Sequence, residues 1–284
     1  MLDVDGRTGL CCLIGDPVEH SVSPAMHNAA YKAAGLNYVY LAFRIRENAL
    51  RKVVEGFRAL NVRGINVTTP HKVSVMPLLD ELDEGAELMG AVNTIVNRKG
   101  KLKGYNTDGL GFLKALTPER IDDKRVVVLG AGGAARAIAY TAAGRCSELA
   151  LLNRTPAKAK QLAEEIAEKT GKEMSWGSLK DADRFMEGCE LLINATSVGM
   201  YPSVEDSPVE AGWLKRRMAV FDAVYNPVET RLLKDAKASG EEVISGLEML
   251  VQQGAESIRL WFDVEPEVAL MRKAALEALR VGGR

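Results

Sequence analysis

Residues 126–137 decide the fold that this sequence predicts, and they read VVVLGAGGAARA. An apolar run typical of a buried strand leads directly into Gly130 and Gly132, and small and apolar residues typical of a helix follow. In this G-x-G-x-x-A order the first glycine allows a tight turn, and the second lets the backbone approach a pyrophosphate. The small residue Ala135 lets the helix and the strand pack closely. We therefore expect a dinucleotide-binding unit whose phosphate loop consists of Gly130, Ala131, Gly132, Gly133 and Ala134.

The end of the next strand indicates which dinucleotide binds. Residues 151–160 read LLNRTPAKAK, so this strand end carries Asn153, Arg154 and Thr155, and Lys158 follows shortly after. A site for NAD places an acidic side chain here to bind the ribose 2′-hydroxyl, and this stretch contains none. A guanidinium suits a 2′-phosphate through its paired N–H groups and its charge. The sequence therefore predicts NADP(H), with a solvated basic helix start as the alternative interpretation.

The rest of the chain repeats strand and helix patterns in turn. Strands are expected at 9–15, 38–45, 64–69, 91–98, 101–106, 124–130, 148–154, 173–178, 189–196, 218–225 and 241–246. Helices are expected at 24–35, 47–61, from Pro70 to about residue 89, from about residue 107, and at 133–144, 157–171, 247–262 and 266–280. Such alternation predicts the α/β class with mostly parallel sheets.

A polar, proline-containing stretch, LTPERIDDK at 116–124, is the expected domain boundary. We expect an N-terminal α/β substrate-binding and catalytic domain over residues 1–118, joined by the closing helices from about residue 255 to residue 284. A Rossmann-type NADP-binding domain is expected over residues 119–254, with a cleft between the two domains.

Composition excludes several classes of protein. The formal net charge of −1 gives no electrostatic footprint for nucleic acid or for a membrane surface. The longest apolar runs fall short of the roughly 20 residues of a spanning helix, and the N-terminus does not predict a signal peptide, so we expect a cytoplasmic protein.

The four cysteines and three histidines match no metal or disulfide spacing, and we expect no metal. The oligomeric state cannot be read from this sequence, and a homodimer stays open.

Polar residues follow several of the predicted strands in the first half of the chain, where ligands of α/β sheets bind. Lys72 is one of several polar residues at comparable strand-end positions, and the others are Asn66, Thr68, Asn93 and Asp108. A carboxylate near Lys72 would orient the ammonium group and stabilise its charged form. Lys72 could then exchange a proton with a substrate hydroxyl. The alternatives are a solvent-facing lysine and, for Asp108, an ordinary acidic residue in the first turn of a helix.

Ser21 and Ser23 flank another predicted helix start, with Pro24 at the first helical position. One interpretation is that Ser23 is only an N-cap. The other is that the two hydroxyls, beside a helix N-terminus, bind a carboxylate ligand. Spacing does not decide between these two interpretations.

Taken together, the motifs resemble those of the shikimate dehydrogenase family almost from end to end. The matching blocks are GDPVEHSVSPAMHN (15–28), GINVTTPHK (64–72), GAVNT (90–94), GYNTDGLG (104–111), GAGGAAR (130–136), NRT (153–155), NATSVGM (194–200), DAVYNPVETRLL (222–233) and GLEMLVQQG (246–254). The resemblance implies NADPH-dependent, reversible reduction of 3-dehydroshikimate to shikimate on the way to chorismate and the aromatic amino acids.

The resemblance also implies a role for individual residues. Ser21 and Ser23 would hold the substrate carboxylate, and Lys72 and Asp108 would form the catalytic pair that faces across the cleft. The other implied substrate-binding residues are Thr68, Asn93, Tyr225 and Gln253. The implied cofactor-binding residues, besides the glycine loop, are Glu84, Asn153, Arg154, Thr155, Lys158, Val224 and Gly246.

Two other functions remain open at this point. A quinate/shikimate dehydrogenase that prefers NAD should carry an acidic residue after Arg154, where Thr155 and Pro156 stand. A non-catalytic NADP-binding sensor could keep the fold but would be free to lose Lys72 or Asp108, and both are present.

Overall fold

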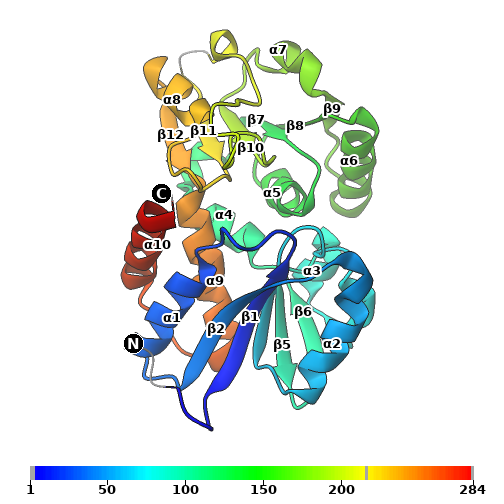
Figure 1. The fold of residues 1–284 in the computed structure, drawn as a ribbon. Coiled ribbons are helices and arrows are strands. Elements are labelled where there is room, and N and C mark those ends of the chain that lie inside the picture. Colours follow the sequence, from blue (N-terminus) through cyan, green and yellow to red (C-terminus); the bar gives the residue numbers. More distant parts are fainter. Residues whose placement is uncertain (1–3, 215–216, 283–284) are drawn as a thin grey trace. The chain divides into compact units, whose positions relative to one another are not determined.

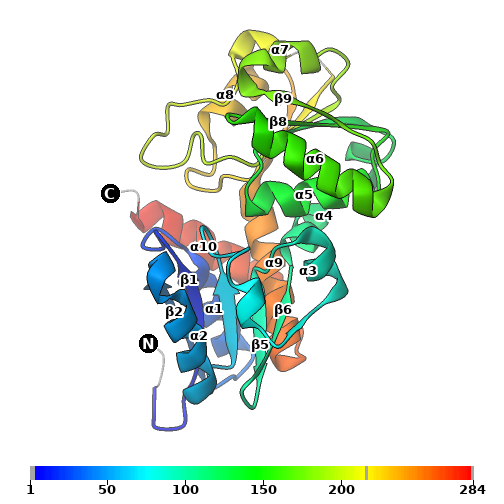
Figure 2. The same cartoon turned by 90° about the vertical axis from the view of Figure 1, so that its right-hand side faces the viewer.

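The structure is a computed structural model that describes residues 4–214 and 217–282. By their internal contacts the residues divide into unit 1, Met1–Thr107 with Val251–Arg284, and unit 2, Asp108–Leu250. Figures 1 and 2 show an α/β arrangement in each unit, which confirms the predicted class. The division falls after Thr107 and Leu250, whereas the sequence placed the boundaries after residues 118 and 254.

Unit 1 is built on a mixed, six-stranded sheet of order β2-β1-β3-β5-β6-β4. Its strands are β1 (Gly9–Gly15), β2 (Tyr38–Arg44), β3 (Gly64–Val67), β4 (Glu81–Leu82), β5 (Thr94–Arg98) and β6 (Lys101–Tyr105). Its helices are α1 (Ser23–Ala33), η1 (Glu47–Ala49), α2 (Leu50–Ala59), η2 (Met76–Leu78), α3 (Glu84–Met89), the residues of α9 (Gly246–Phe262) from Val251 onward, and α10 (Val268–Gly282).

Helices cover both faces of this sheet (Figure 1). On one face Leu50, Val54 and Phe57 of α2 pack over Ile14 and Ile65 of the central strands. The apolar spacing of α2 is therefore the stripe that its sequence predicted. On the other face lie α1 and α9, and α10 packs against α1. There the Trp261 indole lies where a β-carbon on Gly64 would stand, so this strand position has no room for a side chain.

The structure corrects the expectation of one long helical stretch between Pro70 and residue 89. Residues 69–75 form turns, and η2, β4 and the six-residue α3 follow. Pro77 lacks the N–H that a helix interior needs. The Asp80 carboxylate instead accepts a hydrogen bond from Leu102 N at 2.6 Å, and β4 pairs in parallel with β6. Pairing with the sheet edge has replaced the helix.

Unit 2 is a fully parallel sheet of order β12-β11-β10-β7-β8-β9, in which the chain order reverses between β7 and β10. Its strands are β7 (Arg125–Leu129), β8 (Glu148–Asn153), β9 (Ser175–Ser178), β10 (Leu191–Asn194), β11 (Ala219–Asp222) and β12 (Glu242–Ser245). Its helices are α4 (Asp108–Ala115), η3 (Pro118–Arg120), α5 (Gly133–Ala143), α6 (Pro156–Thr170), η4 (Leu179–Asp181), α7 (Ala182–Phe185), η5 (Ala211–Trp213), α8 (Arg231–Ala238) and the first turn of α9. This is the doubly wound, Rossmann-type order, whose ligand crevice lies at the reversal point.

All four cysteines are buried and free. Cys11 and Cys12 lie in β1, whereas Cys146 and Cys189 lie in unit 2. Burial raises the pKa of the Cys11 and Cys189 thiols to about 12. The cysteines therefore act as small apolar core residues, as the sequence predicted.

Candidate functional site

One edge of the sheet in unit 1 gathers the polar strand ends. The strands β1 and β3 run parallel, so the residues that follow Gly15 and Val67 leave the sheet at the same edge. β5 runs antiparallel to β3, with Asn66 opposite Thr94, and Thr94 pairs with Tyr105 of β6. The start of β5 and the end of β6 therefore reach this edge too. We call it the polar edge of unit 1.

Ser21 and Ser23 lie in the loop and the first helical turn that follow β1. The structure corrects one interpretation, because Ser23 is the first residue of α1 and Val22 occupies the N-cap position without a side-chain cap bond. The Ser21 hydroxyl oxygen accepts a hydrogen bond from Ser23 N at 3.2 Å. Ser23 is buried, and Ser21 is partly buried. The two hydroxyls thus stand at a helix N-terminus, whose N–H groups favour an anion.

Lys72 lies in the turns that follow β3, and hydrogen bonds fix the main chain on both sides of it. Thr68 O accepts a hydrogen bond from His71 N at 2.9 Å, and Lys72 O accepts one from Val92 N at 2.8 Å. The His71 ring is fully buried, and its Nε2 donates to Ile45 O at 2.6 Å. These bonds hold Lys72 beside the start of β5, and sequence reasoning had not identified His71 as part of this support.

Asn93 lies at the centre of the polar edge. Its Oδ1 accepts a hydrogen bond from Thr107 N at 2.8 Å, and its Nδ2 donates to Thr107 Oγ1 at 2.9 Å and to Gln253 Oε1 at 3.4 Å. Gln253 comes from α9, far away in the sequence. The structure therefore brings together two predicted substrate-binding residues and adds Thr107, which directly precedes Asp108.

Asp108 is the first residue of α4 and is 5% exposed. A carboxylate in the first turn stabilises a helix through the helix dipole, so the ordinary interpretation of this residue holds. Thr107 N is held by Asn93, which ties the chain immediately before Asp108 to the polar edge.

The glycine loop in unit 2 follows β7 as predicted. Gly130 has φ +119°, and a β-carbon there would lie 2.8 Å from Ala195 O, so the turn itself requires glycine. A β-carbon on Gly132 would meet no described atom within 4 Å, and this residue is the N-cap of α5. The fold therefore leaves open space at Gly132, which is the position where a pyrophosphate must approach the backbone. The loop fits the phosphates of a dinucleotide.

The predicted 2′-phosphate residues lie at the end of β8 and the start of α6. Arg154, Thr155 and Lys158 are exposed, and Asn153 Nδ2 donates to Thr155 O at 3.1 Å. Thr155 is the N-cap of α6, and Pro156 opens the helix. Two cations thus stand beside a helix N-terminus, an arrangement that an anion would stabilise.

A buried carboxylate that the sequence analysis did not identify supports the loops at the ends of β10 and β11. Asp222 Oδ1 accepts hydrogen bonds from Asn194 Nδ2 at 2.9 Å and from Val224 N at 3.0 Å, and Oδ2 accepts one from Thr230 Oγ1 at 2.6 Å. Burial raises the pKa of Asp222 to about 6, although these bonds act against the shift. Asp222 therefore fixes Val224 next to the partly buried Tyr225.

Gly246 opens α9 directly after β12. A β-carbon there would lie 2.4 Å from Ala223 O, so the loop after β11 closes tightly over it. Glu84, another of the predicted cofactor-binding residues, is exposed at the start of α3 in unit 1.

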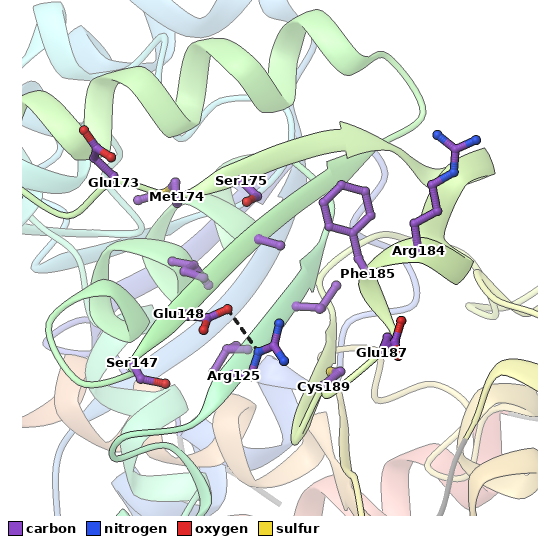
Figure 3. Close-up of a pocket in the computed structure, with 14 residues that line it drawn as sticks. Arg125, Ser147, Glu148, Glu173, Met174, Ser175, Arg184, Phe185, Glu187 and Cys189 are labelled. Carbon is purple, nitrogen blue, oxygen red and sulfur yellow. Dashed lines mark hydrogen bonds and ion pairs between the residues drawn. The ribbon is translucent and has the colours of Figure 1, made fainter.

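A cavity of about 340 Å³ in unit 2 is not this site (Figure 3). It is lined by the residues that begin β7, β8 and β9, with Arg125 bound to Glu148 at 3.0 Å between Nε and Oε2. These are the amino ends of parallel strands, whereas ligands of such sheets bind beyond the carboxyl ends. The loops after β7 and β8 remain the candidate site.

Within residues 4–214 and 217–282, the His, Cys, Asp and Glu side chains form no group of three or more that could hold a metal ion. None of the helices in these residues combines the length and the apolar character needed to cross a membrane.

Three family models match the chain. Residues 13–95 match the shikimate dehydrogenase substrate binding domain, residues 113–232 match shikimate / quinate 5-dehydrogenase, and residues 246–276 match the shikimate 5'-dehydrogenase C-terminal domain. A relative named shikimate dehydrogenase (NADP(+)), from Methanocaldococcus jannaschii, is 47% identical over 283 residues, which cover 97% of this chain and 99% of the relative.

Two solved structures are similar over almost the whole chain. A crystal structure of a shikimate dehydrogenase in complex with NADP+ has a TM-score of 0.92 and 46% identity, covering 98% of both chains. The shikimate 5-dehydrogenase of Thermus thermophilus, in complex with NADP(H) and shikimate, has a TM-score of 0.84 and 40% identity, covering 95% of this chain and 99% of that chain.

Proposed function

Because this chain belongs to the shikimate dehydrogenase family, we propose that it catalyses the reversible, NADP-dependent interconversion of 3-dehydroshikimate and shikimate. The observation that carries the proposal is the polar edge of unit 1. Hydroxyl and amide groups from several strand ends and from α9 gather there, and the main chain of Lys72 is held beside them, which suits a small polyhydroxylated acid.

The residues of unit 1 would bind the substrate. Ser21 and Ser23, at the N-terminus of α1, hold its carboxylate. Asn93 and Gln253 bind ring hydroxyls together with Thr68, since amides and hydroxyls can both donate and accept. Tyr225, which belongs to unit 2, would be a further substrate-binding residue.

Lys72 would exchange the proton of the reacting hydroxyl, and Asp108 would be its carboxylate partner. A carboxylate keeps the ammonium charged and oriented, so that it can donate to the developing alkoxide or accept in reverse. We expect Lys72→Ala to lower kcat about 10²- to 10⁴-fold, the usual contribution of a positioned acid or base. The thermal midpoint and the Kd for NADP+ should not change, because Lys72 lies outside the glycine loop.

The cofactor supplies the hydride when it is bound. Gly130 to Ala134 would hold its pyrophosphate, and Asn153, Arg154, Thr155 and Lys158 its adenosine phosphate. Val224 and Gly246 would lie against the nicotinamide, and Glu84 would be a further contact of the cofactor. Arg154→Ser should raise KM for NADP+ at least tenfold and leave KM for NAD+ unchanged, because only NADP+ carries the 2′-phosphate. An unchanged KM for NADP+ would remove this assignment.

One assay tests the function as a whole. The wild-type protein is given shikimate or quinate with either NADP+ or NAD+, and nicotinamide reduction is followed by absorbance. We expect the highest kcat/KM for shikimate with NADP+. A higher value for quinate with NAD+ would favour the quinate enzyme, and no turnover with any pair would favour a non-catalytic sensor.

We also propose the bounds of the two domains and the compartment in which the protein acts. The substrate-binding and catalytic domain would span residues 1–118 with residues from about 255 to 284, and the NADP-binding domain residues 119–254. The protein would act in the cytoplasm, as a soluble biosynthetic enzyme. Size-exclusion chromatography with light scattering would show whether it is a homodimer.

A further inference from the structure

Beneath the polar edge of unit 1 lies a buried cluster of polar side chains to which the sequence motifs gave no binding role. Tyr40 of β2, Thr94 of β5 and Ser257 of α9 are all 0% exposed, and Asn66 of β3 is 5% exposed. The Asn66 amide is at the centre. Its Nδ2 donates to Ser257 Oγ at 2.9 Å, to Thr94 Oγ1 at 3.0 Å and to Asn93 O at 3.2 Å.

The orientation of this amide follows from its partners. Asn93 O is a main-chain carbonyl and can only accept, so the NH2 group of Asn66 must face it. Asn66 Oδ1 then faces the opposite way, toward Tyr40. The hydroxyl of Tyr40 donates to it at 2.7 Å, which is the only hydrogen bond that Asn66 Oδ1 accepts among the described residues.

The cluster continues to the residues proposed to bind the substrate. Thr94 Oγ1 donates to Asn93 Oδ1 at 3.0 Å and lies 2.9 Å from Ser257 Oγ. Ser257 in turn donates to Gln253 O at 3.0 Å, one turn back along α9. The orientation of Asn66 therefore constrains Asn93 through Thr94, and Gln253 through Ser257.

The Tyr40 ring is itself held in place from the Ser23 side. It stacks on the His27 imidazole with 4.0 Å between ring centroids and 12° between planes. Nδ1 of His27 donates to Ser23 O at 2.9 Å. Burial lowers the pKa of His27 to about 4, so the ring is neutral at physiological pH.

We propose that Tyr40 is a positioning residue for the substrate, which acts through Asn66 to orient Asn93 and Gln253. This inference rests on the proposed function and deepens it. Without the Tyr40 proton, Asn66 Oδ1 is a buried acceptor with no donor, which is unfavourable. Rotation of the amide would relieve this but would turn its oxygen toward the Asn93 carbonyl, and the cluster would lose its single arrangement.

The test compares Tyr40→Phe with Tyr31→Phe. Both changes remove one hydroxyl from a fully buried ring, and both rings lie beside His27, at 4.0 and 6.1 Å between centroids. The Tyr31 hydroxyl lies beside the Cys11 thiol and makes no bond to the cluster. We expect Tyr40→Phe to raise KM for shikimate about tenfold. KM for NADP+ should stay unchanged, and Tyr31→Phe should leave both values unchanged.

A second variant tests the same route through Asn66 from its other side. Ser257→Ala removes one acceptor of the Asn66 amide without touching Tyr40. If both act through Asn66, the effects of Ser257→Ala and Tyr40→Phe on KM for shikimate should not multiply in the double variant. Calorimetric binding of shikimate in the absence of turnover should follow the same pattern.

The outcomes separate the two proposals. If the wild-type protein does not oxidise shikimate, the proposed function fails. If it does, and Tyr40→Phe matches Tyr31→Phe in KM for shikimate, only the positioning role of Tyr40 fails. A rise in KM for NADP+ equal to that for shikimate would also overturn it, because it would indicate a general loss of structure.

Discussion

At the scale of single residues, two buried side chains titrate between pH 4 and 6.5, and burial moves their pKa values in opposite directions. Burial lowers the pKa of His27 from 6.5 to about 4, and it raises that of Asp222 from 3.8 to about 6. In both residues burial disfavours the charged form, which is why the two pKa values move in opposite directions. One acts in unit 1 and the other in unit 2, so their effects on stability can be separated by substitution.

His27 should make the protein more stable as the pH rises from about 4 to 6.5. In this window the unfolded chain binds the proton and the native state does not, so stability is complete above the unfolded pKa and is lost as the pH falls. The shift corresponds to about 3 kcal/mol. In His27→Gln, the pH dependence of the free energy of unfolding should lose this rise, as measured by urea denaturation. An unchanged slope would show that folding does not lower the pKa of His27.

Asp222 should have the opposite effect. Its native pKa lies above the unfolded value, so its contribution is complete below about pH 4 and is lost as the pH rises through about 6, again by about 3 kcal/mol. The free energy of unfolding of Asp222→Asn, relative to wild type, should therefore increase over this range. The same urea series measures it. A relative stability that stays constant with pH would contradict the buried, high-pKa carboxylate.

At the scale of elements, the β7–α5 turn separates two roles of glycine. Gly130 is required by the fold, since its φ is +119° and Ala195 O stands 2.8 Å from any β-carbon. Gly132 has free space around it, so only a ligand would exclude a side chain there. The same motif thus contains one residue for folding and one for binding.

Alanine at each position should show this difference. We expect Gly130→Ala to destabilise the protein by about 2 kcal/mol or more, because it combines a strained φ with a steric clash. Gly132→Ala should keep the wild-type thermal midpoint but raise the Kd for NADP+ at least tenfold. Differential scanning calorimetry and fluorescence titration measure the two effects. Equal loss of stability in both variants would refute the distinction.

The sequence predicted such local units well and long-range ones poorly. The turn after β7 and the two strands on either side of Lys99 and Gly100 are confirmed, because each depends on neighbouring residues. The sequence indicated no role for Asp222 or Tyr40, because their hydrogen-bond partners come from distant parts of the chain. The segment after Pro70 was wrongly predicted as helical, because its apolar spacing did not reveal that it pairs with β6. The site residues named from sequence stay predictions until substrate and cofactor assays are done.

At the scale of the whole molecule, unit 1 is assembled from both ends of the chain. Val251–Arg284 returns to the unit that Met1–Thr107 begins, and α10 packs on α1. Trp261 is fully buried against β3 and donates from Nε1 to Ile95 O at 2.9 Å. Unit 2 is continuous in sequence.

A chain that ends at Leu250 should therefore lose unit 1 and keep unit 2. The removed residues carry Trp261 and, together with α1, cover one face of the sheet. Without them the apolar residues beneath Trp261 are exposed to water. In hydrogen exchange, peptides from β1 and β3 should exchange within seconds, while peptides from β7 and β10 stay protected. A chain that ends at Val281 is the control. Protection of β1 and β3 in the shorter chain would show that unit 1 does not depend on its C-terminal part.

The placement of the four thiols offers a readout of that behaviour without any engineered label. Each unit contains two of them. Cys11 and Cys12 are fully buried in unit 1 and Cys146 is buried in unit 2, so a reagent such as a maleimide should reach them only when their unit opens. Alkylation followed by peptide mass spectrometry would therefore report, residue by residue, which unit opens first under heat or denaturant. The native cysteines thus report the opening of each unit separately.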